Sequence, residues 1–356
     1  MKDIHRIPRR DFLKRAGFAA GAAALGGARL FVPGAKAAFR PDDPYGQIHF
    51  PISGLGRTAP PARVALVKGD DRYAIVLRSL KLIEDDVVRS IGTKKVLIKP
   101  NIVLPDCAAC VTHVDAVRAV LDFLAPHVKS RILIAESANK DTMEGFRYNG
   151  YLSLEKDYNV RLMDLNRDSA SNRYVLGLDN KPTRIRIVDT LLDPDLYVIS
   201  VARMKTHNYV FVTLSIKNVI LASPLNDAKY NDKGLMHQAA PARHDLLHYN
   251  MFHIGQEVFP DLAVIDGFIG IEGNGPAWGS PIASHVALAS LDAVAADITG
   301  TRVMGFDPKI VNYLNVMADA GMGQGDIGKI ELVGTPLEQC IMKYKPNQRM
   351  AELYKL

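Results

Sequence analysis

The sequence contains few cysteines, and this scarcity limits the cofactors that it can hold. Three cysteines occur among 356 residues, and three thiolates cannot supply the four ligands of an ordinary iron–sulfur cluster. Internal repeats, coiled-coil heptads and low-complexity tracts are also missing, as are the HExxH and Walker A motifs. We therefore expect a globular protein without an iron–sulfur cluster of its own, whose site has to be found residue by residue.

Outside the N-terminal segment, the sequence also has no excess of positive charge. The chain has 44 Lys and Arg against 38 Asp and Glu, but residues 1–37 hold eight of the basic and two of the acidic residues. The rest of the chain carries 36 of each sign. This balance gives no reason to expect a nucleic-acid partner. No later segment approaches the roughly 20 apolar residues of a stable membrane span.

The N-terminal segment, residues 1–37, has the pattern of a twin-arginine signal peptide. Arg9 and Arg10 precede a Gly/Ala-rich apolar run, and Ala35-Lys36-Ala37 supplies the small residues after which cleavage is expected. A membrane-anchoring helix is the alternative, but Arg29 interrupts the apolar run. The pattern predicts export by the twin-arginine translocase to the periplasm or another extracytoplasmic compartment.

The remaining chain divides into three parts. Residues 38–62 are rich in Pro and Gly without a period, which predicts an extended arm. Residues 63–335 alternate apolar strands with amphipathic helices, and residues 336–356 form a C-terminal tail. The alternation predicts an α/β fold with a mixed or mainly parallel sheet and helices on both faces. One domain, or two α/β lobes with a cleft between them, would satisfy this pattern.

Hydrophobic periodicity places the individual elements. Thr112 and Asp115 are expected to form a capping box at the start of one helix. Residues 203–260 and 267–284 are polar or Gly-rich and are expected to be irregular. The expected strands are 63–68, 95–99, 131–135, 160–163, 184–188, 196–202, 262–266, 285–290 and 329–333, and the expected helices are 73–91, 114–124, 292–304 and 308–320.

Polar residues that follow the strand at 196–202 form the first candidate site. Lys205 and His207 come directly after it, and Lys217-Asn218 and His237 follow along the chain. In open α/β sheets ligands bind beyond the carboxyl ends of strands. Imidazole serves as a metal ligand or an acid/base group, and a lysine can hold an anion or act as a nucleophile. We expect Lys205 and His207 to be catalytic, Lys217 and Asn218 to bind a cofactor, and His207 and His237 to ligate a metal; a surface turn is the alternative.

The glycine-rich stretch from Asp266 to Pro276 forms the second candidate site. Its glycines allow the main chain to approach a ligand closely, and Asp266, Glu272 and Asn274 offer acceptors for a cation or for hydroxyl groups. We expect Glu272 to be catalytic and Asp266 and Asn274 to bind a cofactor. The alternative is a tight structural loop.

The third candidate site joins a strand end to a helix start. Lys99 and Asn101 follow one strand, and His113 opens the next helix, whose N-terminus favours anions. We expect Lys99 and Asn101 to bind a cofactor and His113 to be catalytic. Asn101 as a turn former and His113 as a solvated residue are the alternatives.

The cysteines and the remaining histidines admit structural interpretations. The spacing of Cys107 and Cys110 allows a local disulfide or a redox pair, but it favours a structural role as a loop staple or as two spare thiols. His244, His248 and His253 lie four and five residues apart, which favours helix-surface or core histidines over metal ligands.

Taken together, these motifs resemble the DUF362 family, a domain of unknown function. The resemblance covers roughly residues 63–335 and implies a fold and a site rather than a reaction. A weaker similarity is to the lactate racemase family, whose nickel-containing organometallic cofactor is attached through a lysine. That similarity implies that Lys217 holds a cofactor, that His237 ligates its metal, and that His207 and His113 exchange protons with the substrate.

Three functions are compatible with the sequence. The first is an exported enzyme that uses a divalent metal or a nickel-type organometallic cofactor on a small hydroxy- or carboxylate-bearing molecule. The second is a non-catalytic periplasmic protein that binds or delivers an anionic ligand or a metal. The third is a redox protein that uses Cys107 and Cys110.

Overall fold

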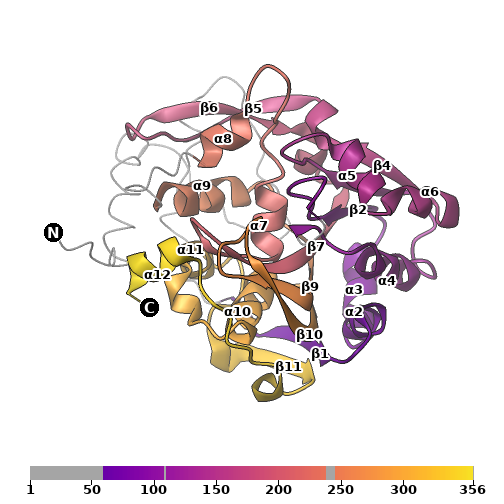
Figure 1. The fold of residues 1–356 in the computed structure, drawn as a ribbon. Coiled ribbons are helices and arrows are strands. Elements are labelled where there is room, and N and C mark those ends of the chain that lie inside the picture. The colour runs from indigo at the N-terminus through magenta and orange to yellow at the C-terminus, as the bar shows by residue number, and fades with distance from the viewer. Residues whose placement is uncertain (1–58, 108–109, 238–244, 356) are drawn as a thin grey trace.

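The computed structural model describes residues 59–107, 110–237 and 245–355 (Figure 1). The predicted signal peptide, nearly all of the predicted arm and His244 lie outside these ranges. Among the described helices, none is long and apolar enough to cross a bilayer. The fold and the site are therefore built from the ranges given above.

One continuous nine-stranded sheet forms the centre of the protein. Its strands follow the order β11-β1-β10-β9-β7-β2-β3-β4, and β8 pairs with the end of β7. Neighbours from β9 to β4 are parallel, whereas β10 and β8 are antiparallel to their partners. The strands are β1 Ala62–Lys68, β2 Lys95–Pro100, β3 Ile132–Glu136, β4 Val160–Asp164, β7 Leu196–His207, β8 Phe211–Thr213, β9 Leu262–Glu272, β10 Ser280–Ser290 and β11 Ile330–Gly334.

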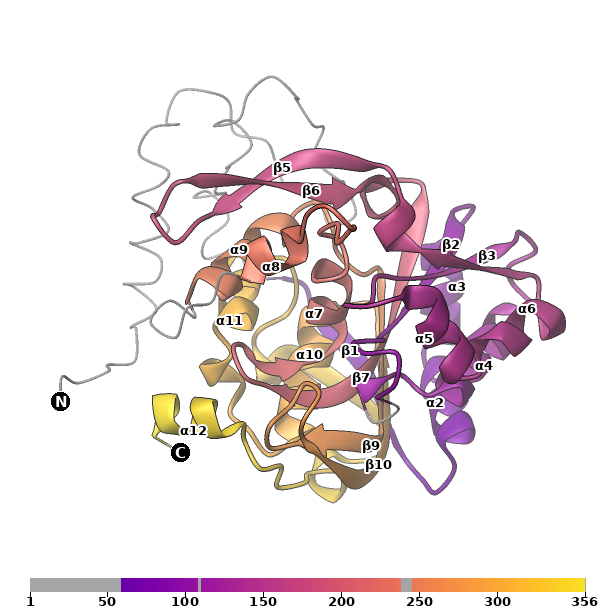
Figure 2. The same cartoon turned by 45° about the horizontal axis from the view of Figure 1, so that its top comes forward.

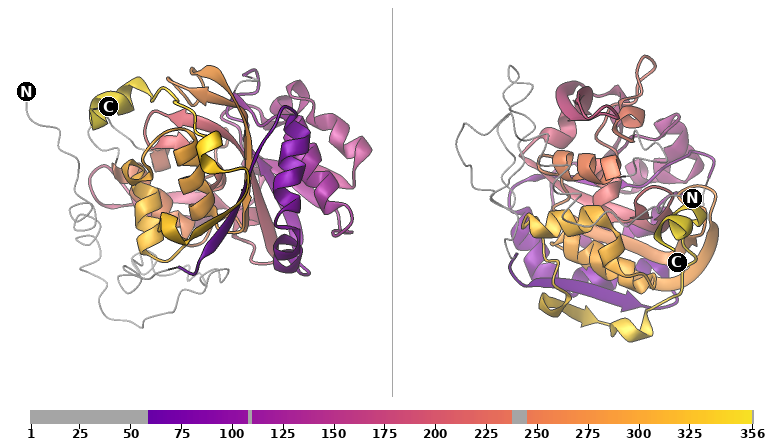
Figure 3. Two further views of the ribbon diagram at one scale, coloured as in Figure 1. Left: turned by 90° about the horizontal axis from the view of Figure 1, so that it is seen from below. Right: turned by 90° about the vertical axis from the view of Figure 1, so that its left-hand side faces the viewer.

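Helices cover both faces of this sheet, and Figure 3 (left) shows the indigo helices on one side and the orange and yellow helices on the other. Helices α2, α3 and α4 contribute to one apolar core, and α7, α9, α10 and α11 contribute to the other. The predicted mixed, mainly parallel sheet with helices on both faces is confirmed, as one sheet rather than two lobes. The helices are α2 Arg72–Lys81, α3 Glu84–Ile91, α4 Val114–Leu124, α5 Thr142–Tyr148, α6 Leu154–Asp157, α7 Ser215–Ile220, α8 Asp232–His237, α9 Asp245–Gly255, α10 Ala293–Val303, α11 Asn312–Asp319 and α12 Gln348–Tyr354.

The side-chain period of the strands explains the two cores. In β1, Val64 and Leu66 belong to one core and Ala65 and Val67 belong to the other, because successive side chains point to opposite faces. Strands that are buried on both faces read as continuous apolar runs. This is why the sequence pattern locates them well.

A second, two-stranded sheet lies apart from the main one. Strands β5 (Ala170–Leu176) and β6 (Pro182–Val188) form an antiparallel hairpin, which passes over α8 and α9 in Figure 2. The sequence pattern predicted only a strand at 184–188. The hairpin matters for the site because it packs on α8, which carries two of the cavity's side chains.

Two segments that were expected to be irregular contain regular structure. Strand β7 continues to His207, and β9 and β10 extend far into 267–284. The prediction was wrong because Lys205 and His207 are polar, whereas both are buried in the strand; buried charged residues are rare enough that the pattern ends the strand before them. At Gly270, an added Cβ would lie 2.0 Å from the Tyr344 hydroxyl oxygen, so this glycine permits close packing rather than a loop.

Two helix predictions need correction. The helix expected over 73–91 is divided into α2 and α3 by a turn at Leu82 and Ile83. The N-cap of α4 is His113 rather than Thr112, because the His113 ring accepts the Asp115 N–H. The Thr112 hydroxyl instead accepts the Asn101 N–H at 2.9 Å and donates to the Val201 carbonyl at 2.7 Å, which ties the start of α4 to β7.

The C-terminal segment packs back onto the sheet. Buried Tyr344 shares a 2.7 Å hydrogen bond with Ser284 of β10, and Met350 of α12 is fully buried. The backbone N–H of Lys345 donates to the Glu272 carboxylate at 2.9 Å. Residues 336–355 therefore cover the ends of β9 and β10.

Candidate functional site

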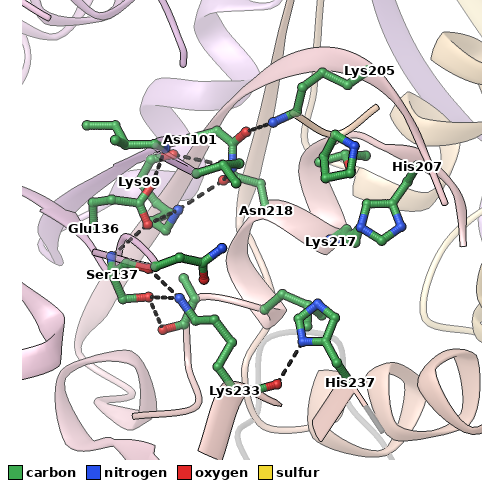
Figure 4. A pocket seen from close by; sticks show the side chains of 17 residues that line it. Lys99, Asn101, Glu136, Ser137, Lys205, His207, Lys217, Asn218, Lys233 and His237 are labelled. Atoms are coloured by element: carbon green, nitrogen blue, oxygen red, sulfur yellow. Dashed lines mark hydrogen bonds and ion pairs between the residues drawn. The ribbon is translucent and has the colours of Figure 1, made fainter. Parts of the chain in front are cut away.

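A cavity lies at the carboxyl ends of three parallel neighbours, β7, β2 and β3, and is closed by α7 and α8 (Figure 4). It encloses about 520 Å³ of empty space, part of which is open to solvent. The position agrees with the expectation that ligands bind beyond the carboxyl ends of strands.

Four lysines dominate the lining of the cavity. Lys99 comes from β2, Lys205 from β7, Lys217 from α7 and Lys233 from α8, and all four are buried. Within the described ranges, Glu136 of β3 is the one carboxylate among the lining side chains. Buried lysines are rare unless they are paired, so a cluster of four against one carboxylate demands an explanation.

Lys99 is the lysine that is paired with this carboxylate. Its ammonium lies 2.8 Å from Glu136 and donates to the Asn218 side-chain oxygen at 2.9 Å. Burial lowers the pKa of Lys99, and the Glu136 charge opposes that effect. The same carboxylate accepts the backbone N–H groups of Ser137 and Ile102. The Lys99–Glu136 pair is therefore part of a satisfied polar network.

Lys205 and Lys233 are held by oxygen acceptors instead of carboxylates. Lys205 donates to the Asn101 side-chain oxygen and, at 3.3 Å, to the Cys110 carbonyl. Lys233 donates to the Ser137 carbonyl and, at 2.9 Å, to the Ser137 hydroxyl. Burial lowers the pKa of each of the two lysines to about 8. Both amines therefore have defined positions on the cavity wall.

Lys217 differs from the other three lysines. No hydrogen bond or ion pair reaches its amine from the residues that the structure describes, and no dashed line meets it in Figure 4. Burial, followed by the charges of Lys205, Lys233 and Lys99, lowers the pKa of Lys217 to about 7. A large fraction of this amine is uncharged at neutral pH.

Two neutral imidazoles stand beside Lys217. The His207 Nδ1 accepts the N–H groups of Tyr209 at 3.1 Å and Val210 at 3.4 Å, so the proton of this ring is assigned to Nε2. The His237 Nδ1 lies 2.7 Å from the Lys233 carbonyl. Because this oxygen can only accept a hydrogen bond, the proton of the ring is assigned to Nδ1. His207 thus presents an N–H donor and His237 presents a lone pair.

The same surroundings keep both rings uncharged. Burial and then the Lys217 charge lower the pKa of His237 to about 3 and that of His207 well below its ordinary value. The two rings therefore keep complementary hydrogen-bonding roles at neutral pH.

Helix α7 is held firmly at the cavity. The Asp297 carboxylate of α10 accepts the Ser215 N–H at 2.8 Å, the Ser215 hydroxyl and the Ile216 N–H at 3.1 Å. Asn218 donates to the Lys99 carbonyl at 2.9 Å and to the Ser200 hydroxyl at 3.0 Å. These contacts place Lys217 over the sheet.

The structure brings together seven of the eleven sequence-predicted site residues. The residues of this group that line the cavity are Lys99, Asn101, Lys205, His207, Lys217 and Asn218, together with His237 as a seventh from α8. Their meeting follows from topology, because β2 and β7 are adjacent and parallel although about a hundred residues of chain separate them.

Four predicted residues do not line the cavity. His113 caps α4, and Asp266 forms a 3.2 Å ion pair with Arg72. Glu272 accepts the Lys345 N–H, and the Asn274 side-chain oxygen accepts the Gln348 N–H at 3.5 Å. From the glycine-rich stretch only Pro276 reaches the cavity. Each of the four has one of these contacts outside the cavity, and a functional role for any of them stays a prediction.

The sequence analysis missed five polar lining residues, which are Glu136, Ser137, Asn139, Thr213 and Lys233. Glu136 and Ser137 end β3, so the rule that placed Lys99 at the end of β2 would have found them. Lys233 lies on the six-residue helix α8, whose sequence has no pattern that separates it from a loop. Its place at the cavity follows only from the tertiary fold.

The cysteines and the α9 histidines have structural settings. Cys107 and Cys110 are free thiols, and burial raises the pKa of Cys110 to about 12, which makes it a poor nucleophile. His248 is buried and its Nδ1 accepts the Tyr313 N–H at 3.1 Å. His253 is also buried in α9. His248 and His253 are core histidines.

The lining chemistry does not fit a bare divalent metal ion. Among the described residues, no group of three or more His, Cys, Asp or Glu side chains is placed to hold a metal. The lysine amines would repel a cation, and the Glu136 oxygens already accept hydrogen bonds. The other ring nitrogen of His207, Nε2, carries an N–H rather than a lone pair. Of the two described histidines that line the cavity, His237 is the one whose Nε2 keeps a lone pair.

Comparison with known proteins identifies related sequences. The profile of a family described as "Domain of unknown function (DUF362)" matches residues 96–302. A thylakoid-associated protein of Synechocystis sp. is 25% identical over 231 residues, which cover 64% of this chain and 68% of that protein. The family match includes β2, β7, α7 and α8, and hence most of the cavity lining.

Two solved structures share part of the fold. The lactate racemase apoprotein of Thermoanaerobacterium thermosaccharolyticum is 12% identical, with a TM-score of 0.40 over 69% of this chain and 57% of that chain. A protein from Thermotoga maritima is 11% identical, with a TM-score of 0.40 over 72% and 60% of the two chains. The matched region spans less than two thirds of each of these structures.

Proposed function

The chain belongs to the DUF362 family, and from that premise we propose that its lysine-rich cavity is an active site. The site binds a small carboxylate- or phosphate-bearing molecule and moves a proton to or from it. The observation that carries this proposal is the set of four buried lysines that face one already paired carboxylate.

An anionic ligand would relieve the main electrostatic cost of the cavity. Burial lowers the pKa values of Lys205, Lys217 and Lys233, which means that their charged forms are destabilised in the free protein. A carboxylate or phosphate among them supplies the opposite charge, and charge-assisted hydrogen bonds to such groups are strong. Binding is therefore expected to be accompanied by proton uptake.

The two imidazoles supply the proton-transfer groups. A bound anion opposes the burial and the Lys217 charge that lower the pKa of His237, so its Nε2 lone pair becomes basic enough to accept a proton from the bound molecule. The His207 N–H donates a hydrogen bond to an oxygen on that molecule. The neighbouring ammonium groups stabilise negative charge that develops on that oxygen. Proton transfer by a positioned base contributes about 10²–10⁴-fold to a rate.

A preassembled organometallic cofactor, such as a nickel-type one, is a different case from a bare ion because it brings donor atoms of its own. In the part of the chain that the structure describes, the Lys217 amine and His237 Nε2 are the two groups available to hold it. Such a group would add metal-centred chemistry to the same cavity. Native mass spectrometry of the protein purified from its source cytoplasm tests whether it carries such a cofactor. An added mass that is present in the wild-type protein and missing from Lys217→Met supports the cofactor. A wild-type mass equal to that of the bare polypeptide contradicts it.

The other functions have less support. A non-catalytic binding or delivery protein would use the same lysines without the two histidines. A redox role for Cys107 and Cys110 conflicts with the raised pKa of the buried Cys110 thiol. Export through the twin-arginine pathway remains part of the proposal and rests on Arg9 and Arg10.

Binding and turnover are tested together. Inorganic phosphate, lactate, malate and pyruvate are expected to raise the melting temperature of the protein above that in chloride of the same ionic strength. In D₂O, proton NMR is expected to show exchange of a C–H proton next to the carboxylate or carbonyl for at least one of the organic acids. Stabilisation without exchange would favour the non-catalytic protein, and no stabilisation by any of them would contradict the proposal.

The variant His237→Gln identifies the base. It is expected to lower the exchange rate by about a hundredfold or more while the anion still binds. His127→Gln is the matched control, because His127 lies on the surface beside Glu84 and away from the cavity. Equal exchange rates in both variants would remove His237 from the mechanism.

A further inference from the structure

We propose that Lys217 is a nucleophile that forms an imine with the carbonyl group of an α-keto carboxylate bound in the cavity. This inference rests on the proposed function and names its substrate class. The Lys217 amine has no partner among the described residues, and it lines a cavity whose three other lysine amines are all engaged; this contrast is the observation that points to the imine.

The contrast among the four lysines separates binding groups from a reactive one. Lys99, Lys205 and Lys233 each donate two or more hydrogen bonds to oxygen acceptors of the protein. An ammonium that is held in this way is a fixed positive charge. The Lys217 amine has no acceptor among the described residues, so nothing in this part of the protein stabilises its protonated form.

Nucleophilic attack requires an amine with a free lone pair. A lysine that is buried beside other cationic groups loses its proton more readily than one in water. Lys217 meets both conditions, since it is 7% exposed and the charges of Lys205, Lys233 and Lys99 lower its pKa to about 7. The other three lysines therefore act on Lys217 as well as on the ligand.

Imine formation is balanced without any further reactant. The Lys217 nitrogen attacks the carbonyl carbon, the C–N bond forms, and the electron pair of the C=O bond moves to oxygen. The C–O bond then breaks as the nitrogen lone pair closes the C=N bond. The two amine protons leave with the carbonyl oxygen as water, so the step needs no oxidant and no reductant.

The surrounding groups specify the rest of the substrate. The carboxylate of a keto acid matches the ammonium groups of Lys205 and Lys233, which are held in place by the Cys110 carbonyl and by the Ser137 hydroxyl respectively. An imine that becomes protonated withdraws electrons and acidifies a neighbouring C–H bond. The His237 lone pair is then positioned to remove that proton, which links the covalent step to proton transfer.

Reductive trapping tests the inference on the full-length protein. Pyruvate followed by sodium borohydride is expected to add one reduced pyruvate per chain, and peptide mapping is expected to place it on Lys217. Lys309→Met, which changes an exposed lysine, is expected to leave the yield unchanged. Lys217→Met and Lys217→Arg are each expected to lower it by about tenfold or more.

The outcomes separate this inference from the proposed function. If pyruvate raises the melting temperature but borohydride traps nothing, the imine is refuted and anion binding stands. If pyruvate neither stabilises nor labels the protein, both are refuted. Labelling of any other lysine in the wild-type protein overturns the role of Lys217, and this result does not depend on whether a variant folds.

Discussion

At the scale of single residues, the site is defined by lysines whose environments differ. Lys99 was predicted from its place at a strand end, and the structure adds its partner Glu136. Residue type and strand-end position could be read from the sequence. Whether an amine is paired could not, because its partners come from elements more than thirty residues away in the chain.

The first prediction concerns stability. Lys217→Met is expected to raise the free energy of unfolding at pH 7 by about 2–4 kcal/mol, because each pKa unit of the burial-induced shift corresponds to about 1.4 kcal/mol. Lys99→Met is expected to lower it by about 3–5 kcal/mol, because it leaves the buried Glu136 carboxylate without its cation. Urea unfolding measures both, and a loss of stability in Lys217→Met would argue for a structural lysine.

The second prediction concerns pH. The pKa of Lys217 is lowered from 10.5 to about 7 by burial and by Lys205, Lys233 and Lys99. Between these values the unfolded chain binds a proton that the folded protein does not, so the wild-type protein gains stability as pH rises through this window.

The comparison of Lys217→Met with the wild-type protein isolates this group. The stability advantage of the variant is expected to be largest below pH 7 and to shrink as pH rises toward 10. The other charged or titratable groups at the cavity, Lys99, Lys205, Lys233, His207, His237 and Glu136, are present in both proteins. A pH-independent difference would contradict the lowered pKa.

At the scale of elements, periodicity predicted the strands that are buried on both faces. Periodicity failed at the end of β7, where the polar residues Lys205 and His207 are buried. Lys205 is stabilised there by Asn101, and His207 is stabilised by the backbone of residues 209 and 210. Periodicity also failed for α8, a helix of six residues that packs under the β5–β6 hairpin. Such elements depend on tertiary contacts more than on local sequence.

The third prediction concerns the attachment of α7. Asp297→Ala is expected to cost about 2–4 kcal/mol of stability, because it leaves the Ser215 and Ile216 N–H groups unpaired in the core. Trapping of pyruvate on Lys217 is expected to fall although Lys217 is unchanged, since α7 no longer holds its position.

A surface cap provides the control for Asp297. Asp326→Ala removes a carboxylate that accepts the Gly328 N–H at 3.0 Å at an exposed site, and it is expected to cost about 1 kcal/mol or less with full trapping. Equal effects of the two variants would mean that Asp297 is no more than an ordinary cap.

At the scale of the whole molecule, topology assembles the site. Because β7, β2 and β3 pair in parallel, their carboxyl ends bring together side chains from residues 99 to 207. Helices α7 and α8 close the cavity from the other side. The α/β class, and the position of the site at the carboxyl ends of the strands, were predictable from the alternation of elements. The pairing order was not, because it is decided by long-range contacts that leave no local pattern.

The fourth prediction concerns localisation. Replacement of Arg9 and Arg10 by lysine is expected to keep the protein in the cytoplasm, because the translocase recognises a twin-arginine signal by this pair of arginines. Cell fractionation measures the distribution. Unchanged export would contradict a twin-arginine signal and leave the cavity proposals untouched.

The most direct test of the central claim is isothermal titration calorimetry of small anions at the lysine-rich cavity. Inorganic phosphate and pyruvate are expected to bind the full-length protein with one site per chain and with proton uptake. Affinity is expected to fall by about tenfold or more in Lys205→Met and to be unchanged in Lys309→Met, since a buried charge pair with a ligand is worth more than a surface contact. Absence of binding, or equal affinity in the two variants, would contradict the account.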